Sequence, residues 1–166
     1  MTVDDLRSTL HESRARLFAS IRGLDEEEFR FAREPGAWNI ATHLAHLFRI
    51  ERIFAERARA ALIEDGVMCA STRIVNDDDP ALARQLAVPQ IIHGMQAARR
   101  ELEAVLDAGA RALARSIAHE TRGRMTIEQI AQKMADHERE HGADVGALAL
   151  QAAAARRVTI PITPRA

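Results

Sequence analysis

Two histidines occupy successive positions on the apolar face of one predicted helix. His137 and His141 fall on the apolar stripe of the last long helical pattern, between Met134 and Val145. Residues four apart on a helix share a face and lie roughly 6 Å apart, so both imidazoles can point at one ion. Neutral imidazole binds Zn, Ni, Cu and Fe, but a metal site takes three or four ligands. The pair therefore predicts part of a metal site; the alternative is two hydrogen-bonded core histidines.

The third ligand has two candidates, both on an earlier predicted helix. His43 lies near the centre of that helix's apolar stripe and His46 lies at its edge, so helical geometry slightly favours His43. However, Asn39 is the expected N-cap, and Trp38 and His43 then take the two ends of a hydrophobic staple. His43 has a packing role in that interpretation, and the spacing leaves the choice between the two histidines open.

Other polar residues near the pair have less defined roles. Asp144 follows His141 by three residues and can hydrogen-bond a ligand histidine from behind. Glu138 and Glu140 point away from the metal face by helical spacing, so we expect both to be solvated. The remaining histidines fall off the apolar stripes or in a turn and are also expected to be solvated: His11, His93 and His119.

The run 137–141 also matches the H-E-x-x-H signature of zinc proteases. The extended form of that signature needs Gly and His at positions 144 and 147, where this chain has Asp144 and Ala147. The other form needs a later acidic ligand, and Asp144 is the last acid of the chain. No sheet is predicted that could bind a peptide as an added strand. A protease therefore ranks a distant third among the functions considered.

Composition excludes several other classes. The chain has 166 residues, of which 47% are apolar and 28% charged, so it can bury the core of one domain and is not intrinsically disordered. Its net charge of −1 provides no basic field for nucleic acid. The most apolar stretch, Val145 to Ala155, is too short to span a membrane, which needs roughly 20 apolar residues. The acidic N-terminus and the single Cys69 lead us to expect a reducing, cytoplasmic location.

The elements that must position the histidines are all predicted to be helical. Alanine, arginine, glutamate and leucine dominate the chain, and no alternating β-branched run argues for a strand. Four long helices are expected. They begin at a Thr2–Asp5 capping box, at Asn39, at Pro80 with a kink or restart at Pro89, and at a Thr126–Gln129 capping box.

Shorter segments connect these helices. We expect one extra turn near residues 25–28, a loop over 67–78 that contains Cys69, and a short helix over 110–118. The predicted organisation is an all-α four-helix bundle domain over residues 1–155 and an extended C-terminal tail over 156–166, whose prolines oppose a helix.

Two motifs resemble those of a known family. Pro35-Gly36-Ala37-Trp38-Asn39-Ile40 followed by Leu44-Ala45-His46-Leu47 is similar to the first motif of the DinB-like (DinB/YfiT) metal-binding superfamily, in which a ligand histidine follows a tryptophan by eight positions. Thr126-Ile127 leading to the run 137–141 resembles the second motif, a His-x-x-x-His on the last helix. The resemblance covers about residues 3–150. It implies that His46, His137 and His141 are the metal ligands and that His43, where the family has an aliphatic residue, packs.

The resemblance also carries expectations about activity. It implies a four-helix bundle with a long crossover, a homodimer, and a divalent metal ion, for which Zn and Ni are the leading candidates. Three neutral ligands leave an open position on the ion, which suits a metal-dependent transferase or hydrolase that uses a small thiol cosubstrate. The alternative is a non-catalytic, metal-binding stress-response dimer. Asp144 stands where the family often has glutamine, so no substrate contact is transferred to it.

Overall fold

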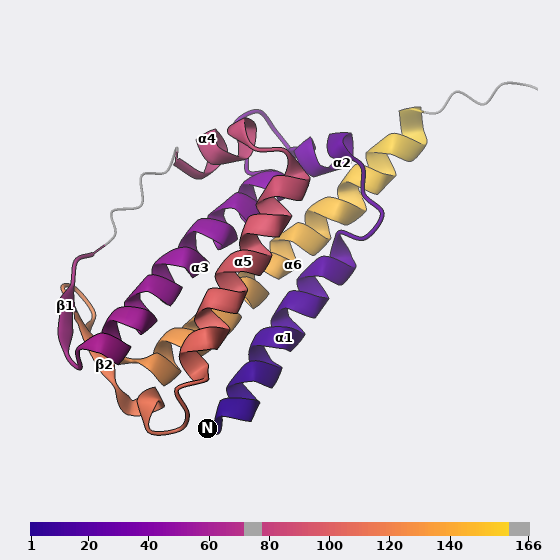
Figure 1. Cartoon of the computed structure of the whole chain (residues 1–166). Coiled ribbons are helices and arrows are strands. Elements are labelled where there is room, and N and C mark those ends of the chain that lie inside the picture. The colour runs from indigo at the N-terminus through magenta and orange to yellow at the C-terminus, as the bar shows by residue number, and fades with distance from the viewer. Residues whose placement is uncertain (72–77, 160–166) are drawn as a thin grey trace, which may run out of the picture.

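Four long helices lie side by side in a computed structural model of the chain, which describes residues 1–71 and 78–159 (Figure 1). They are α1 (Val3–Ser20), α3 (Ile40–Ile63), α5 (Val88–Leu106) and α6 (Ile127–Thr159). Helix α3 packs against α5 and α6, and α1 packs against α6. Helices α3 and α5 run in the same direction, and α4 (Asp78–Gln85) lies at the end of the bundle where both begin. The predicted four-helix bundle with a long crossover is confirmed.

The caps expected from the sequence set the starts of the helices. Thr2 and Asp5 form the reciprocal capping box of α1, and the Asn39 side chain accepts a hydrogen bond from the Thr42 N–H at 2.9 Å. At α6 the Gln129 N–H donates to Thr126 Oγ1 at 3.2 Å, and the Thr126 N–H donates to Gln129 Oε1 at 2.9 Å. These bonds satisfy backbone groups that have no partner inside a helix. Helix α5 restarts with Pro89 in its first turn, as predicted.

A small sheet, which the sequence did not predict, closes one end of the bundle. Strand β2 (Ser116–His119) pairs in parallel with β1 (Val67–Cys69) and antiparallel with β3 (Gly123–Thr126). The expected helix over 110–118 is therefore wrong, apart from the 3₁₀ turn η1 (Ala112–Ala114), and Cys69 ends a strand rather than lying in a loop. Strands of three or four residues give too few alternations to show a period of two. Their pairing also depends on the path of the chain, which brings Ile117 into the core.

Two further boundaries differ from expectation. The turn near residues 25–28 forms α2 (Glu26–Arg30), capped by Asp25. Helix α6 continues through Thr159 rather than ending near Ala155, and Arg156 on it pairs with Asp25 at 2.6 Å. This ion pair joins the C-terminal part of α6 to the residue that caps α2. The sequence of α6 alone gives no sign of this contact. The rest of the predicted tail, residues 160–166, lies outside the described residues.

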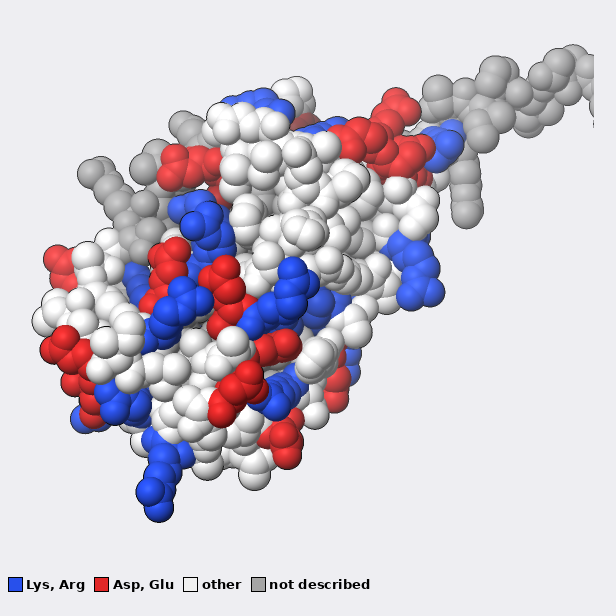
Figure 2. Space-filling view, in the orientation of Figure 1, with Lys and Arg blue, Asp and Glu red and all other residues white. Residues whose placement is uncertain are grey.

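The surface carries charges of both signs. On the face shown in Figure 2, basic and acidic side chains are interspersed rather than gathered by sign. Among the described helices, none is both long and apolar enough to cross a membrane.

Candidate metal centre

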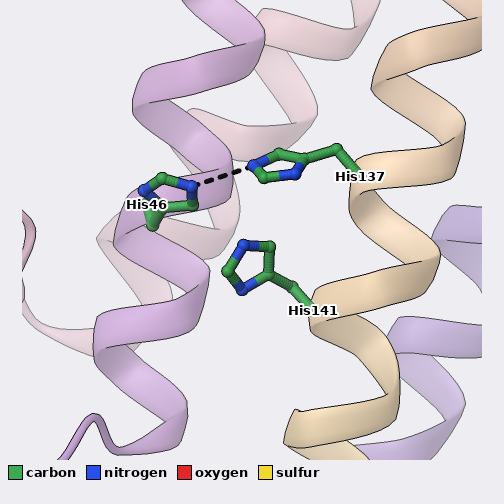
Figure 3. A group of neighbouring side chains, drawn as sticks. All are labelled: His46, His137 and His141. Carbon is green, nitrogen blue, oxygen red and sulfur yellow. Dashed lines mark hydrogen bonds between the residues drawn. The ribbon is translucent and has the colours of Figure 1, made fainter. Parts of the chain in front are cut away.

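Three histidines from two helices converge inside the bundle (Figure 3). His46 projects from α3 and is buried, and the half-buried His137 and His141 project from successive turns of α6. The Nε2 atoms of His46 and His137 lie 2.9 Å apart, and one nitrogen from each of the three rings can be chosen so that all lie within 4.8 Å of one another. Tetrahedral ligands at normal Zn–N distances are separated by about 3.3 Å. The residues singled out by the sequence therefore fit a divalent metal ion.

The other ring nitrogens of these histidines face partners behind the site. His46 Nδ1 donates to Asp79 Oδ2 at 2.7 Å, and His141 Nδ1 lies 2.8 Å from His43 Nδ1. His137 Nδ1 lies 3.6 Å from the Glu140 carboxylate. A partner on Nδ1 fixes the ring and leaves Nε2 as the coordinating atom, which is how metal-binding histidines are usually held. This pattern, present at His46 and His141, supports the assignment of these rings as ligands.

The electrostatic surroundings of the cluster favour a bound cation. Burial lowers the pKa of His137 and of His141, and the neighbouring histidines lower that of His141 further, to about 3. These two imidazoles are therefore neutral near pH 7 and can coordinate without first losing a proton. Burial alone would raise the pKa of Asp79, but hydrogen bonds from His46 and Arg49 outweigh it and lower this pKa to about 2. Asp79 is thus an anion behind the site.

Asp79 is the main participant that sequence reasoning missed. It lies in the first turn of α4, is fully buried, and accepts hydrogen bonds from Arg49 Nε at 2.6 Å and from Arg49 Nη2 at 2.9 Å. The sequence assigned it only to the start of a helix beside Pro80. No local signal could have placed it behind His46, because the crossover that brings α4 to this position depends on the whole fold.

His43 keeps its expected packing role and also takes the position behind a ligand histidine that was considered for Asp144. His43 packs edge-on against Trp38 with ring centroids 5.2 Å apart, as the staple predicted. Its ring also stands directly behind His141, the place considered for Asp144. Asp144 lies beside this pair, where one nitrogen of His43, one of His141 and a carboxylate oxygen lie within 4.8 Å of one another. Trp38 further covers the cluster by stacking on His141, with centroids 6.0 Å apart.

Glu138 is not solvated, contrary to expectation. It is fully buried and belongs to a ring of alternating charges that takes one residue from each long helix: Arg14 of α1, Glu51 of α3, Arg99 of α5 and Glu138 of α6. Ser13 donates to it at 2.5 Å and Arg99 at 2.9 Å. His46 stands where it could serve as the third ligand that the H-E-x-x-H interpretation lacked. Glu138, however, is held by Ser13, Arg14 and Arg99 and cannot act as a general base for the histidines. The protease hypothesis therefore loses its catalytic residue.

The remaining histidine predictions had mixed outcomes. His11 and His93 are exposed, as expected, and so is Glu140. His119 is buried, contrary to expectation, because β2 carries it under the sheet end of the bundle. Its Nδ1 accepts a hydrogen bond from the Thr121 N–H at 3.2 Å, so its proton resides on Nε2.

The metal centre opens onto a cavity of about 270 Å³. His46 and His137 lie at one end of it, and its apolar wall is formed by Ile50, Ile53 and Phe54. The rest of the lining is polar or basic: Arg57, Ser71, His119, Thr121, Arg122 and Lys133. A small molecule in this cavity would reach two of the three candidate ligands.

The fold and the site together define a helical bundle able to hold a divalent metal ion at three converging histidines. The family model of the DinB superfamily matches residues 9–145, and the chain belongs to this superfamily. The prediction drawn from the two motifs is thereby confirmed. A comparison with curated proteins finds no match.

Two solved structures share the fold. The first is TT2238, a four-helix bundle protein, with a TM-score of 0.65 and 18% identity over 88% of this chain and 99% of that one. The second is YfiT from Bacillus subtilis, described as a probable metal-dependent hydrolase with an unusual four-helix bundle topology. It has a TM-score of 0.72 and 17% identity over 90% of this chain and 86% of that one. At such identities the likeness establishes the fold alone.

Proposed function

We propose that this protein is a metal-dependent enzyme, a hydrolase or thiol transferase, that acts on a small electrophile. The observation that carries the proposal is the opening of the His46, His137 and His141 cluster onto the 270 Å³ cavity. A structural metal site is closed by its protein ligands, whereas a catalytic one keeps a position for water or substrate. Three histidine ligands and an adjoining cavity match the second arrangement.

The residues at and around the histidine cluster would have different roles in the proposed reaction. A bound divalent ion would supply Lewis acidity and lower the pKa of a water or thiol at the open position. His46, His137 and His141 would hold the ion through imidazole nitrogens, which would leave its full charge available. Asp79 and His43 fix the rings of His46 and His141 from behind. Trp38 and the apolar wall of the cavity exclude water from part of the site.

Hydrolase and thiol transferase differ in the nucleophile. The description of YfiT as a probable metal-dependent hydrolase supports water as the nucleophile. The resemblance of the two histidine motifs to those of the DinB-like family supports a small thiol as the nucleophile. Zn and Ni remain the leading metals, because imidazole ligands suit both. A non-catalytic metal-binding protein is the alternative, and access from the cavity favours the enzyme.

The first experiment is a metal analysis of protein purified without a histidine tag. The wild type and a His93→Ala control, which removes an exposed histidine on α5, should each hold about one divalent ion per chain, whereas His137→Ala should lose it. Thiol titration of the metal-loaded protein follows. Absence of metal after reconstitution at neutral pH would overturn the proposal. Metal that binds but does not respond to thiols would favour the hydrolase, and no turnover of ester, amide or halide panels would favour the non-catalytic alternative.

A further inference from the structure

The cavity beside the metal centre is lined by basic side chains. Its lining includes the cationic side chains of Arg57, Arg122 and Lys133, and no acidic side chain among the residues that the structure describes. This is unusual for a molecule whose net charge is −1 and whose viewed surface mixes both signs. A cavity lined by one sign of charge concentrates ligands of the opposite sign.

The basic groups stand at graded distances from the metal centre. Lys133 precedes His137 by one helical turn on α6, so the two side chains are neighbours roughly 6 Å apart. Arg57 follows His46 by eleven residues on α3, which corresponds to about 16 Å along the helix axis. Between His46 and Arg57 the same face of α3 presents Ile50, Ile53 and Phe54. Lys133 therefore stands beside the metal end of the cavity, the apolar residues form its middle, and the arginines stand beyond them.

Two of the three cations that line the cavity, Arg122 and Lys133, are available to a ligand. Within the described part of the chain, neither Arg122 nor Lys133 forms an ion pair with a carboxylate. Arg57 donates from Nη2 to the Ala70 carbonyl at 2.9 Å. Burial lowers the pKa of Arg57; Cys69 opposes this, and the charge of Arg122 adds to it. After burial, the same two arginines also lower the pKa of His119. The guanidinium groups thus lie close enough to repel each other.

A second, wider opening near His137 has the opposite character. This cavity of about 710 Å³ shares Lys133 and His137 with the first but is lined by the acids Glu128, Asp136 and Glu140. Glu128 pairs with the Met1 amino group and Asp136 with Arg139, so this opening has no excess of positive charge, and an anion would favour the smaller cavity. The two openings therefore distinguish ligands by charge.

We propose that the substrate of this site is a small organic anion with a carboxylate or phosphate group. Its acidic group is held by Lys133 and Arg122, with Arg57 and the His119 N–H beyond them. Its hydrocarbon part lies on Ile50, Ile53 and Phe54, which leaves its reactive end at the three histidines. This inference rests on the proposed function for its metal end, but the cationic lining is a property of the cavity itself.

The test compares matched probes in two forms of the protein. Cobalt-loaded protein is titrated with 6-mercaptohexanoate, 6-mercaptohexylphosphonate and the neutral 6-mercaptohexanol, and the thiolate-to-cobalt absorption band is followed. Metal-free protein is titrated with hexanoate and hexanol, and the NMR shifts of the Ile50 and Ile53 methyl groups are followed. We expect each anion to bind about tenfold more tightly than the neutral probe of the same length. The ratio of carboxylate to phosphonate affinity identifies the preferred acid.

Charge-removing variants locate the effect. Lys133→Gln and Arg122→Gln should each weaken anion binding about fivefold to tenfold and leave the alcohols unchanged. Arg139→Gln removes the same charge from an exposed position on α6 outside the cavity and should change neither. Equal affinity for anion and alcohol, or equal losses in all three variants, would overturn the inference. A methyl response to hexanoate without any cobalt response to thiols would instead remove the thiol arm of the proposed function and leave the anion pocket standing.

Discussion

The carboxylate of Asp79 joins a candidate metal ligand to a guanidinium group, since it accepts from His46 on one side and from Arg49 on the other. We expect Asp79→Asn to weaken metal binding about tenfold to a hundredfold, because the amide cannot hold the His46 ring as firmly or increase its basicity. Competition with a chromophoric chelator measures this. Asp78→Asn is the matched control, because the Asp78 carboxylate is half exposed and lies 4.0 Å from the Arg49 guanidinium. Equal affinities for the two variants would contradict the role of Asp79.

Single residues of the site differed in how far the sequence could place them. The spacing of His137 and His141 put both on one face because a helix repeats regularly, and the structure brings them together. The choice between His43 and His46 depended on the angle at which α3 meets α6, which spacing does not contain. The motif resemblance selected His46. Asp79 and His119 lay beyond reach, because their positions depend on the crossover and on the sheet.

At the scale of elements, the four long helices are joined by the ring of Arg14, Glu51, Arg99 and Glu138. We expect Glu51→Gln to lower the free energy of unfolding by about 3 kcal/mol, because the two buried arginines Arg14 and Arg99 then share the single counter-charge of Glu138. Glu56→Gln, on the exposed side of the same helix, should change it by less than about 0.5 kcal/mol. Urea unfolding of metal-free protein measures both. A small loss at Glu51 would mean that water or a rearranged arginine replaces the ring.

The junction between the end of α3 and the sheet depends on Asp65. Its carboxylate accepts from the Ser116 N–H at 2.7 Å and from the Ser116 hydroxyl at 3.0 Å, and these bonds lower its pKa below the ordinary value of 3.8. A lowered carboxyl pKa stabilises the fold fully above pH 3.8, and this contribution is lost as the pH falls toward the lowered value.

We therefore expect Asp65→Asn to be less stable than the wild type at pH 6 and equal to it at strongly acid pH, where Asp65 is protonated and resembles asparagine. Denaturant unfolding across this range tests the expectation. A constant difference at every pH would show that the charge of Asp65 is not involved.

Elements with local signals were predictable and elements without them were not. Capping residues and the 3.6-residue stripe located the long helices, because both operate within one segment. The three strands form only when residues near 67, 117 and 125 meet, so their sequences carry little sign of them. The burial of Glu138 was missed for the same reason, since its arginine partners come from two other helices.

At the scale of the molecule, metal binding should report on the fold because its ligands join α3 to α6. An ion that binds only the folded chain adds about 2.7 kcal/mol at a free concentration one hundred times its dissociation constant. For a chain of this size, we expect the melting temperature to rise by about 5–10 °C. Calorimetry of wild type and His137→Ala with and without zinc tests this. An equal rise in both proteins would place the ion elsewhere.

Assembly and location are further proposals at this scale. The homodimer and the cytoplasmic setting stay predictions, the first from the family resemblance and the second from the sequence. Sedimentation of the metal-loaded protein measures the first directly.

The charge ring sets the axial offset between the helices that carry the histidines. Glu138 is adjacent to His137 on α6, and Glu51 follows His46 by five residues on α3. A slip of one residue between these helices would move them about 1.5 Å and leave four buried charges mismatched. The distances between the three candidate ligands are thus set by buried residues of the charge ring, which do not line the cavity. Apart from His46 and His137, the residues that line the cavity can therefore be exchanged without disturbing the distances between the three candidate ligands.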